Sequence, residues 1–249
     1  MDPILSSAAS GMRARMESLE MLANNLANAS TGGYKSDREF YNIYVAAEAS
    51  EPADDGTGAM PSQQPLIEKH WTDYSQGVLN PTGNALDAAL DGSGFFAVNG
   101  PGGILYTRNG SFRVNSAGVL VSADGYPLRA TTGLTVQLNS QNPIQIQPDG
   151  TVVQDGQAVA QLAVVDFPDR SAINKQGLNY FVNVYPKLSP QASTAVVHQG
   201  HLEQSNASPP DLAVRLISVM RQFESLQKAV SIATDMNKSA VEEVAKVSG

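Results

Sequence analysis

The stretch that decides the fold is residues 5–33, LSSAASGMRARMESLEMLANNLANASTGG. Its apolar residues recur at alternating spacings of four and three, and they are Leu5, Ala9, Met12, Met16, Leu19, Ala23 and Leu26. This heptad period is typical of a helix that buries one narrow stripe against a partner helix. Gly32 and Gly33 follow the repeat, and paired glycines there predict the end of the helix.

The other end of the chain repeats this pattern over a longer stretch. The alternating positions are Leu212, Leu216, Val219, Phe223, Leu226, Val230, Ala233, Asn237, Ala240 and Val244. Ser208 as the cap, Pro209 at the first helical position and Asp211 in the first turn predict where this helix starts. At 1.5 Å per residue, a helix of about 35 residues is a rod of roughly 50 Å.

The middle of the chain, from about residue 78 to residue 197, has no sustained helical period. Short runs typical of strands occur at residues 94–98, 104–107, 111–114 and 118–121. The dipeptides Asn109-Gly110, Asp124-Gly125, Asp149-Gly150 and Asp155-Gly156 predict turns between strands. We therefore expect an antiparallel sandwich or barrel without crossover helices.

These patterns predict an α+β fold with a divided inner domain. Residues 1–35 and 206–249 supply two long helices that pair in a coiled-coil-like manner, and residues 78–205 form a β-rich outer domain. Residues 36–77 form an extended, mobile connection. Within it, residues 48–64 are rich in small polar and acidic side chains, so this part has little to bury.

Composition excludes several classes of function. The net charge is −8, so the chain gains nothing from releasing the counterions of a nucleic acid. It has no basic cluster for an anionic membrane and no apolar run long enough to cross a bilayer. Its 0 cysteines exclude disulfides, thiolate zinc sites and cysteine nucleophiles. The N-terminus lacks the basic and apolar regions of a secretory signal, so composition alone favours the cytoplasm.

We find no constellation of residues that predicts catalysis or metal binding. His198 and His201 have a metal-like spacing, but no cysteine or carboxylate cluster accompanies them, so polar loop histidines are the simpler interpretation. Asp87 and Asp91 would suit glycoside chemistry in principle, yet two acids near a strand entrance are more often turn formers. We expect no catalytic residue, no cofactor, no metal and no small-molecule substrate.

The loop Asp91-Gly92-Ser93-Gly94 has glycines that suit phosphate binding. It departs from the dinucleotide pattern because Ala97 stands where the third glycine belongs. It also leads into a strand instead of a helix. We therefore interpret this loop as a turn.

Four motifs along the chain resemble those of flagellar axial proteins, the rod and hook family. They lie at residues 22–35, at 82–87 with 92–98, at 106–112, and at 203–206 with Arg221 to Glu224 and Lys228. The positions that match the family are Asn24, Asn25, Leu26, Asn28, Ser30, Thr31, Gly33, Gly94, Phe95, Phe96, Tyr106, Thr107, Arg108, Gly110, Phe112, Ser205 and Asn206.

Within this family the chain looks most similar to a proximal-rod subunit. Its length and the sequence Thr82-Gly83-Asn84 fit the rod branch, and residues 221–224 resemble the proximal type. Residues 56–64 do not match the glycine-rich stretch of the distal-rod relative. Ala85 where the family often has proline, and Pro209-Pro210 before the last helix, depart from the pattern, so a distal-rod subunit remains the alternative.

The resemblance implies an α-helical inner domain built from both ends and a β-rich outer domain. It implies export through the flagellar type III apparatus without a cleaved signal, and a place in the periplasmic rod, which transmits torque from motor to hook. This replaces the cytoplasmic expectation. The expected partners are other copies of the chain, neighbouring rod proteins and the export apparatus, with the two helical seams as subunit interfaces.

Two further points stay open at the level of sequence. Asn24, Asn25 and Asn28 lie off the first seam, where they would bond between subunits, line a lumen or face solvent.

A different class of protein, a β-sandwich glycan binder or hydrolase dimerised by its helices, is the second alternative. The aromatic content of 6% argues against it, because sugar sites favour aromatic platforms.

Overall fold

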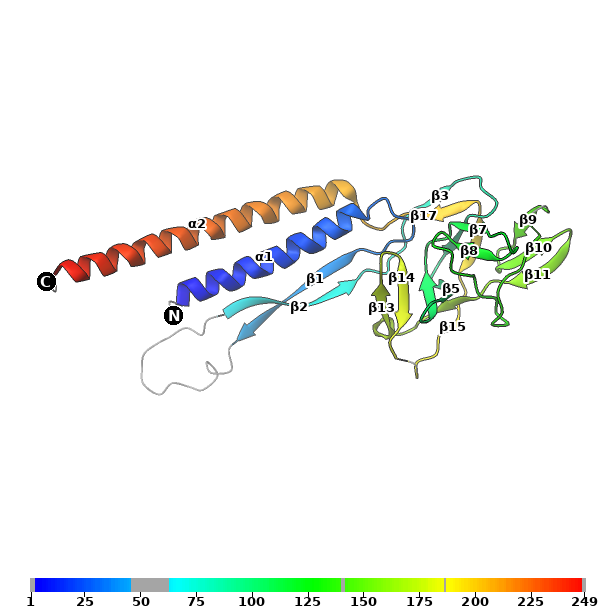
Figure 1. Ribbon diagram of the computed structural model, residues 1–249, viewed down its shortest axis with the longest axis horizontal. Helices are drawn as coiled ribbons and strands as arrows, with labels where there is room; N and C mark the ends of the chain where they lie inside the picture. Colours follow the sequence, from blue (N-terminus) through cyan, green and yellow to red (C-terminus); the bar gives the residue numbers. More distant parts are fainter. Residues whose placement is uncertain (1–2, 46–62, 140–141, 186, 248–249) are drawn as a thin grey trace. The chain divides into compact units, whose positions relative to one another are not determined.

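The computed structural model describes residues 3–45, 63–139, 142–185 and 187–247 (Figure 1). The chain divides into two compact units. The helical unit comprises Met1–Leu26, Asp37–Trp71 and Pro209–Gly249, and the β unit comprises Ala27–Ser36 and Thr72–Ser208. Two long helices and many antiparallel strands confirm the predicted α+β class.

The helical unit contains α1 (Pro3–Ala27) and α2 (Pro209–Val247). Helix α2 begins at Pro209, as the proline predicted, whereas α1 ends at Ala27, five residues before the predicted glycine stop at Gly32 and Gly33. A two-stranded sheet of β1 (Asp37–Val45) and β2 (Gln63–Thr72) accompanies them. None of the described helices is both long and apolar enough to span a membrane.

The predicted connection at residues 36–77 thus contains two strands that the sequence analysis did not identify. The aromatic and β-branched residues of β1, with the sequence DREFYNIYV, are the signal that would have predicted the first of them. Of the stretch predicted to be mobile, residues 48–62 lie outside the described residues, and Gln63 and Gln64 belong to β2.

The β unit begins at the end of α1 and contains the remaining strands. They are β3 (Leu79–Pro81), β4 (Ala88–Asp91), β5 (Phe95–Gly100), β6 (Gly103–Thr107), β7 (Phe112–Val114), β8 (Leu120–Ser122), β9 (Ile144–Ile146), β10 (Thr151–Gln154), β11 (Gln157–Gln161), β12 (Val164–Asp166), β13 (Ile173–Gln176), β14 (Tyr180–Asn183), β15 (Gln191–Ala192), β16 (Val196–Gln199) and β17 (His201–Glu203). A short 3-10 helix, η2 (Arg170–Ala172), precedes β13.

The largest sheet has the strand order β13-β14-β6-β5-β12-β15, and all its pairs are antiparallel. Smaller sheets pair β11-β10-β9, β16-β4, β17-β3 and β7-β8. This arrangement agrees with the predicted antiparallel architecture.

Strand β5 is buried on both faces and separates two apolar clusters. Phe96 and Val98 belong to the larger cluster, whereas Phe95 and Ala97 belong to the smaller one. Successive side chains of a strand point to opposite faces, so a run of four apolar residues fills both clusters. Each fully buried phenylalanine contributes about 1.5 to 3 kcal/mol by removing apolar surface from water.

Three of the four predicted turns are present, and one prediction is wrong. Asp155 and Gly156 have φ of 52° and 75°, as a tight hairpin between β10 and β11 requires. Asn109-Gly110 forms no hairpin, because it connects β6 to β7 in a different sheet. Glycine is needed there for close approach, since a Cβ on Gly110 would lie 1.5 Å from the carbonyl oxygen of Ala88.

Candidate functional site

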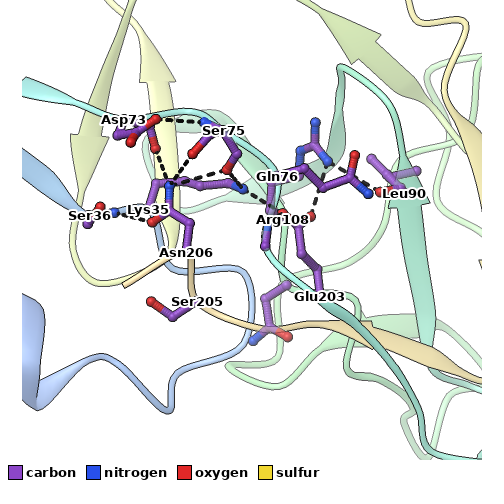
Figure 2. Close-up of polar contacts among 12 residues, drawn as sticks. Lys35, Ser36, Asp73, Ser75, Gln76, Leu90, Arg108, Glu203, Ser205 and Asn206 are labelled. Atoms are coloured by element: carbon purple, nitrogen blue, oxygen red, sulfur yellow. Dashed lines mark hydrogen bonds and ion pairs between the residues drawn. The ribbon is translucent and has the colours of Figure 1, made fainter. Parts of the chain in front are cut away.

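Three charged side chains meet in the interior of the β unit (Figure 2). Lys35 Nζ donates to Glu203 Oε1 at 2.5 Å, and Arg108 Nη1 donates to Glu203 Oε2 at 3.1 Å. The side chains of Lys35 and Glu203 are 0% exposed, and that of Arg108 is 4% exposed. We call these three residues, with Asp73 and Asn206, the polar junction.

Glu203 is held at the centre of the polar junction by backbone as well as by charge. It ends β17, which pairs with β3, and its Oε1 also accepts a hydrogen bond from the amide of Gly77 at 2.9 Å. Its carbonyl oxygen accepts from Gly33 N at 2.8 Å. Gly33 has φ of 68°, and a Cβ on it would lie 2.3 Å from Asn109 N, so only glycine fits there.

Arg108 follows β6 and reaches toward the turn after β4. Its Nη2 donates to the carbonyl of Gly92 at 2.6 Å, and Nη1 lies 3.4 Å from that of Leu90. The guanidinium also lies over the ring of Phe95, with 5.4 Å from Cζ to the ring centroid. The glycine loop at residues 91–94 therefore presents a carbonyl to an internal arginine, which agrees with its interpretation as a turn.

Burial dominates the electrostatics of the two cations. It lowers the pKa of Lys35, and the carboxylate of Glu203 opposes that change through charge and hydrogen bonding. Burial likewise lowers the pKa of Arg108, again opposed by Glu203. Asp73, which is also buried, adds a second negative charge that favours the protonated form of Lys35. Two cations and two carboxylates thus balance inside the β unit.

Asn206 ties together the chain segments that enter and leave the β unit (Figure 2). Its Oδ1 accepts from the amide of Ser36 at 2.8 Å, and its Nδ2 donates to the carbonyls of Asp73 and Ser75 at 2.7 and 3.2 Å. Lys35 Nζ donates to the same carbonyl of Ser75 at 2.7 Å. Ser36, Asp73 and Asn206 each lie within a few residues of a boundary between the units.

The polar junction unites residues from three of the family motifs found in the sequence. Gly33, Arg108 and Asn206 come from separate motifs, and the structure brings them together around Glu203. Lys35 and Glu203 lie within two of the motif stretches, at residues 22–35 and 203–206, but the sequence analysis gave neither of them a role. Two ionisable residues inside stretches of otherwise small and neutral residues were the signal for them, because such residues are buried only when paired.

Five further family positions, all in the β unit, are buried and serve packing or hydrogen bonding within the chain. Phe95, Phe96, Tyr106 and Phe112 are buried in the apolar clusters. Thr107 donates its hydroxyl to the carbonyl of Asn179 at 2.7 Å. These residues explain the β unit's stability and offer no surface to a partner.

Two asparagines of the first motif, Asn25 and Asn28, form side-chain hydrogen bonds within the chain. Asn25 is 2% exposed, donates to the carbonyl of Asp37 at 2.7 Å and accepts from its amide at 2.9 Å. The side chain of Asn28 accepts from Thr31 Oγ1 at 3.4 Å. The interpretation that these asparagines form a solvated polar face is therefore wrong for Asn25 and Asn28, which are buried. Asn24 is exposed.

The acids considered for catalysis have structural partners. Asp87 accepts hydrogen bonds from Thr82 Oγ1 at 2.7 Å and Asn84 Nδ2 at 3.0 Å, which closes the loop of residues 82–87 on itself. Asp91 accepts from Gln76 and lies 3.7 Å from Nε2 of His198.

The two histidines pack edge to face, with ring centroids of His198 and His201 5.9 Å apart. Within the described ranges no three histidines, acids or cysteines lie together as a metal site would need.

The predicted seam of α2 coincides with its least exposed face. Leu212 is buried, and the half-buried members are Leu216, Val219, Phe223, Leu226, Val230 and Ala233. The remaining described side chains between Val214 and Ser239 are exposed, including Asn237. The side chains of Ala240 and Val244 lie outside the described part of the chain.

The predicted seam of α1 does not coincide with its buried face. The buried side chains are Ala14, Ser18, Leu22 and Asn25. Of the seam, Met16 is 50% exposed, Ala9 and Ala23 are exposed, and Met12, Leu19 and Leu26 are half-buried. The side chain of Leu5 lies outside the described part. Gly11 faces α2, since a Cβ there would lie 3.6 Å from Leu226 Cδ1.

Three family models match the chain in order. They describe a flagella basal body rod protein at residues 5–35, a flagellar hook protein FlgE/F/G D1 domain at 89–154, and a flagellar basal body rod FlgEFG protein C-terminal at 198–243. The first and last cover most of the two helices, and the second lies in the β unit.

Relatives match over nearly the whole chain. The flagellar basal-body rod protein FlgF of Caulobacter vibrioides is 32% identical over 92% of this chain and 92% of its own length. FlgG of Buchnera aphidicola subsp. Acyrthosiphon pisum is 30% identical over 95% and 97%. FlgF of Mesorhizobium japonicum is 30% identical over 88% of both chains.

The chain belongs to the flagellar basal-body rod protein family, and its function is that of a structural rod subunit. Both FlgF and FlgG proteins are among its relatives within the family.

Proposed function

We propose that this chain is an FlgF-type subunit of the proximal segment of the rod. The observation that carries this assignment is the 32% identity to a FlgF protein over 92% of both chains. The sequence of residues 221–224 and the absence of a distal-type glycine-rich stretch favour the same branch. The FlgG relatives at 30% identity keep the distal-rod subunit as the alternative.

The proposed role is mechanical, with no enzymatic activity. The polar junction supports this role because its charged groups bind one another and backbone groups, with Nε of Arg108 as the one nitrogen of that guanidinium left without a hydrogen bond. A buried network of this kind fixes one arrangement of the segments that it joins. Asn206 binds the chain segments at the boundaries between the two units to each other. A subunit that transmits torque needs such cross-links, because they keep these segments from moving separately.

Assembly would rest on the helical seams. Within one copy, α1 and α2 pair in a coiled-coil-like manner, and the approach of Gly11 to Leu226 supports this pairing. The exposed seam residues of α1 would contact neighbouring copies and neighbouring rod proteins. A head-to-tail contact that does not close on itself generates a helical tube.

Export would precede this assembly. The chain would pass the flagellar type III apparatus without a cleaved signal, with the two helical ends largely disordered, and reach the periplasm. The ends would then fold on the growing rod, because their apolar stripes have too little to bury alone.

A seam substitution tests the assembly mechanism. Leu26→Asp places a charge on the α1 seam, so we expect loss of motility while the β unit still folds. Loss of the near-ultraviolet circular dichroism of the β unit would assign the defect to folding instead. Normal swimming of the variant would contradict the mechanism.

Quantitative mass spectrometry of hook–basal bodies from the source cells tests the assignment itself. A much lower amount than the distal-rod and hook subunits is the result expected for a proximal segment. An amount equal to that of the distal-rod subunit would agree with membership of the family but would contradict the assignment to the proximal segment. Absence from intact basal bodies would overturn the structural role, and the β unit would then be assayed for glycan binding and hydrolysis.

A further inference from the structure

Three segments of the β unit are bound to one another around the polar junction. We call them together the latch, and they are residues 33–36, 75–83 and 200–206. None of their described residues belongs to either apolar cluster. Tyr34 is buried, and its ring centroid lies 4.3 Å from Nζ of Lys175. The latch is therefore held mainly by hydrogen bonds and charge, whereas the rest of the β unit closes around apolar side chains.

The second and third segments of the latch are joined along their length by backbone hydrogen bonds. The amide of Gln204 donates to the carbonyl of Val78 at 2.9 Å, and the amide of Thr82 donates to that of Gly200 at 2.7 Å. Strands β17 and β3 pair between these two bonds. Among the described strands these two have no other partner, so their pairing depends on the latch alone.

The first segment binds both of the others. Its Gly33 amide donates to the carbonyl of Glu203 at 2.8 Å, and Nζ of Lys35 donates to the carbonyl of Ser75 at 2.7 Å. Asn206 of the third segment donates to the same carbonyl of Ser75, and the three side chains lie close together in Figure 2. Releasing one segment therefore removes hydrogen-bond partners from the other two, which couples the three in one network.

We infer that the latch opens and closes as one unit while both apolar clusters stay closed. Proteins open locally in contiguous cooperative units, and a unit with few buried apolar contacts opens before the core does. Residues 33–36 follow α1 and residues 200–206 lead to α2, so one opening releases the segments next to both helices. For a rod subunit, which rests on the proposed function, closing the latch would fix these segments after the helices are in place.

Gly77 is the position at which a substitution would open the latch from within. A Cβ on Gly77 would lie 2.0 Å from the carbonyl oxygen of Gln204, and its three nearest atoms all belong to the backbone of residues 204 and 205. Backbone atoms cannot turn away as the end of a flexible side chain can, so only glycine allows this approach. Gly77→Ala therefore forces the second segment away from the third and places no atom in either apolar cluster.

Hydrogen exchange of the full-length chain, measured on its peptides by mass spectrometry, tests the latch. We expect Gly77→Ala to raise the exchange rates of peptides from all three segments by similar factors of at least about a hundredfold. Peptides from β5 and β6 should change by less than about threefold. Gly102→Ala is the matched control, because no atom lies within 4 Å of its added Cβ, and it should change neither set.

A second variant removes side-chain hydrogen bonds without a clash. Asn206→Ala deletes the bonds to the backbone of Ser36, Asp73 and Ser75, and we expect exchange in the same three segments to rise at least about tenfold. Asn183→Ala is its control, because this half-buried asparagine binds only backbone groups of its own loop among the hydrogen bonds described. If Gly77→Ala gives no folded chain, Asn206→Ala decides between the outcomes.

Two results would overturn the inference. Exchange that rises equally in β5 and β6 would show that the latch and the apolar clusters open together, and a rise confined to one segment would show that the three are not coupled. Both results would leave the rod assignment intact, because the measurement uses the purified chain. Absence of the chain from intact basal bodies would instead reject the rod assignment and leave the latch unaffected.

Discussion

The β unit and the helical unit bury their apolar residues in opposite ways. In the β unit, two clusters around β5 enclose side chains such as Phe96 and Phe181, and the charges of Lys35 and Glu203 are neutralised inside. In the helical unit, α2 leaves Val214 and Met236 more than half exposed.

Under the proposed function, this difference reflects a β unit that is complete in one copy and a helical unit that neighbouring copies complete. Substitutions in the β unit should therefore act on the stability of the single chain. Substitutions on the exposed helical faces should act on assembly and leave the single chain unchanged.

The largest expected effect is at the centre of the polar junction. Glu203→Leu removes the carboxylate that binds both buried cations, Lys35 and Arg108, so we expect the free energy of unfolding to fall by about 3 to 5 kcal/mol. Urea unfolding of the full chain, followed by near-ultraviolet circular dichroism, measures this loss. Glu224→Gln, at an exposed glutamate of α2, is the control and should change stability by less than about 0.5 kcal/mol.

A triple variant sharpens the same prediction. Replacing all three charges, with Lys35→Met, Arg108→Leu and Glu203→Leu together, removes the buried cations and should recover much of the lost stability. A single variant as stable as the wild type would contradict the described network. A triple variant no more stable than Glu203→Leu would show that the hydrogen bonds to backbone matter more than the charges.

The next effect concerns the glycine beneath Glu203. Gly33→Ala places a Cβ 2.3 Å from the amide nitrogen of Asn109 at a φ of 68°, so we expect a loss of about 3 kcal/mol. Gly102→Ala is the matched control, because no atom lies within 4 Å of its added Cβ and it should cost less than about 0.5 kcal/mol. Equal unfolding midpoints for the two variants would be evidence against this close approach.

The smallest effect depends on alkaline pH. Burial is the main cause that raises the pKa of Tyr180 above its ordinary value of 10.0, and Asp124, which accepts from its hydroxyl at 2.7 Å, adds to it. The unfolded chain releases this proton near pH 10 and the folded chain keeps it, so stability present below that pH is lost above it. Tyr180→Phe should make unfolding less pH-dependent between about pH 9 and 11. An unchanged pH dependence would contradict this assignment.

Sequence patterns predicted those parts of the fold that depend on local periodicity. The spacing of Leu212 to Ala233 predicted both α2 and its less exposed face, and Asp155-Gly156 predicted a hairpin. The pattern of α1 predicted the helix but not its buried face. That face consists of Ala14, Ser18, Leu22 and Asn25, and because two of the four are polar, a search for apolar periodicity does not reveal it.

The polar junction lay beyond such patterns because its contacts are distant in sequence. Lys35 and Glu203 are 168 residues apart, and no local propensity reports a pair of that separation. Asn109-Gly110 likewise has the composition of a hairpin turn. Its role is set by the carbonyl of Ala88, which packs against Gly110 from another strand.

The most direct test of the division between a complete β unit and an incomplete helical unit is a pair of measurements on Met16→Asp. This side chain is half exposed in the single chain, so the urea unfolding midpoint should match that of Met16→Leu and of the wild type. In cells that contain equal amounts of each chain, basal bodies should incorporate Met16→Leu normally and Met16→Asp at less than about a tenth of that level. Normal incorporation of Met16→Asp would contradict an assembly built on the α1 seam.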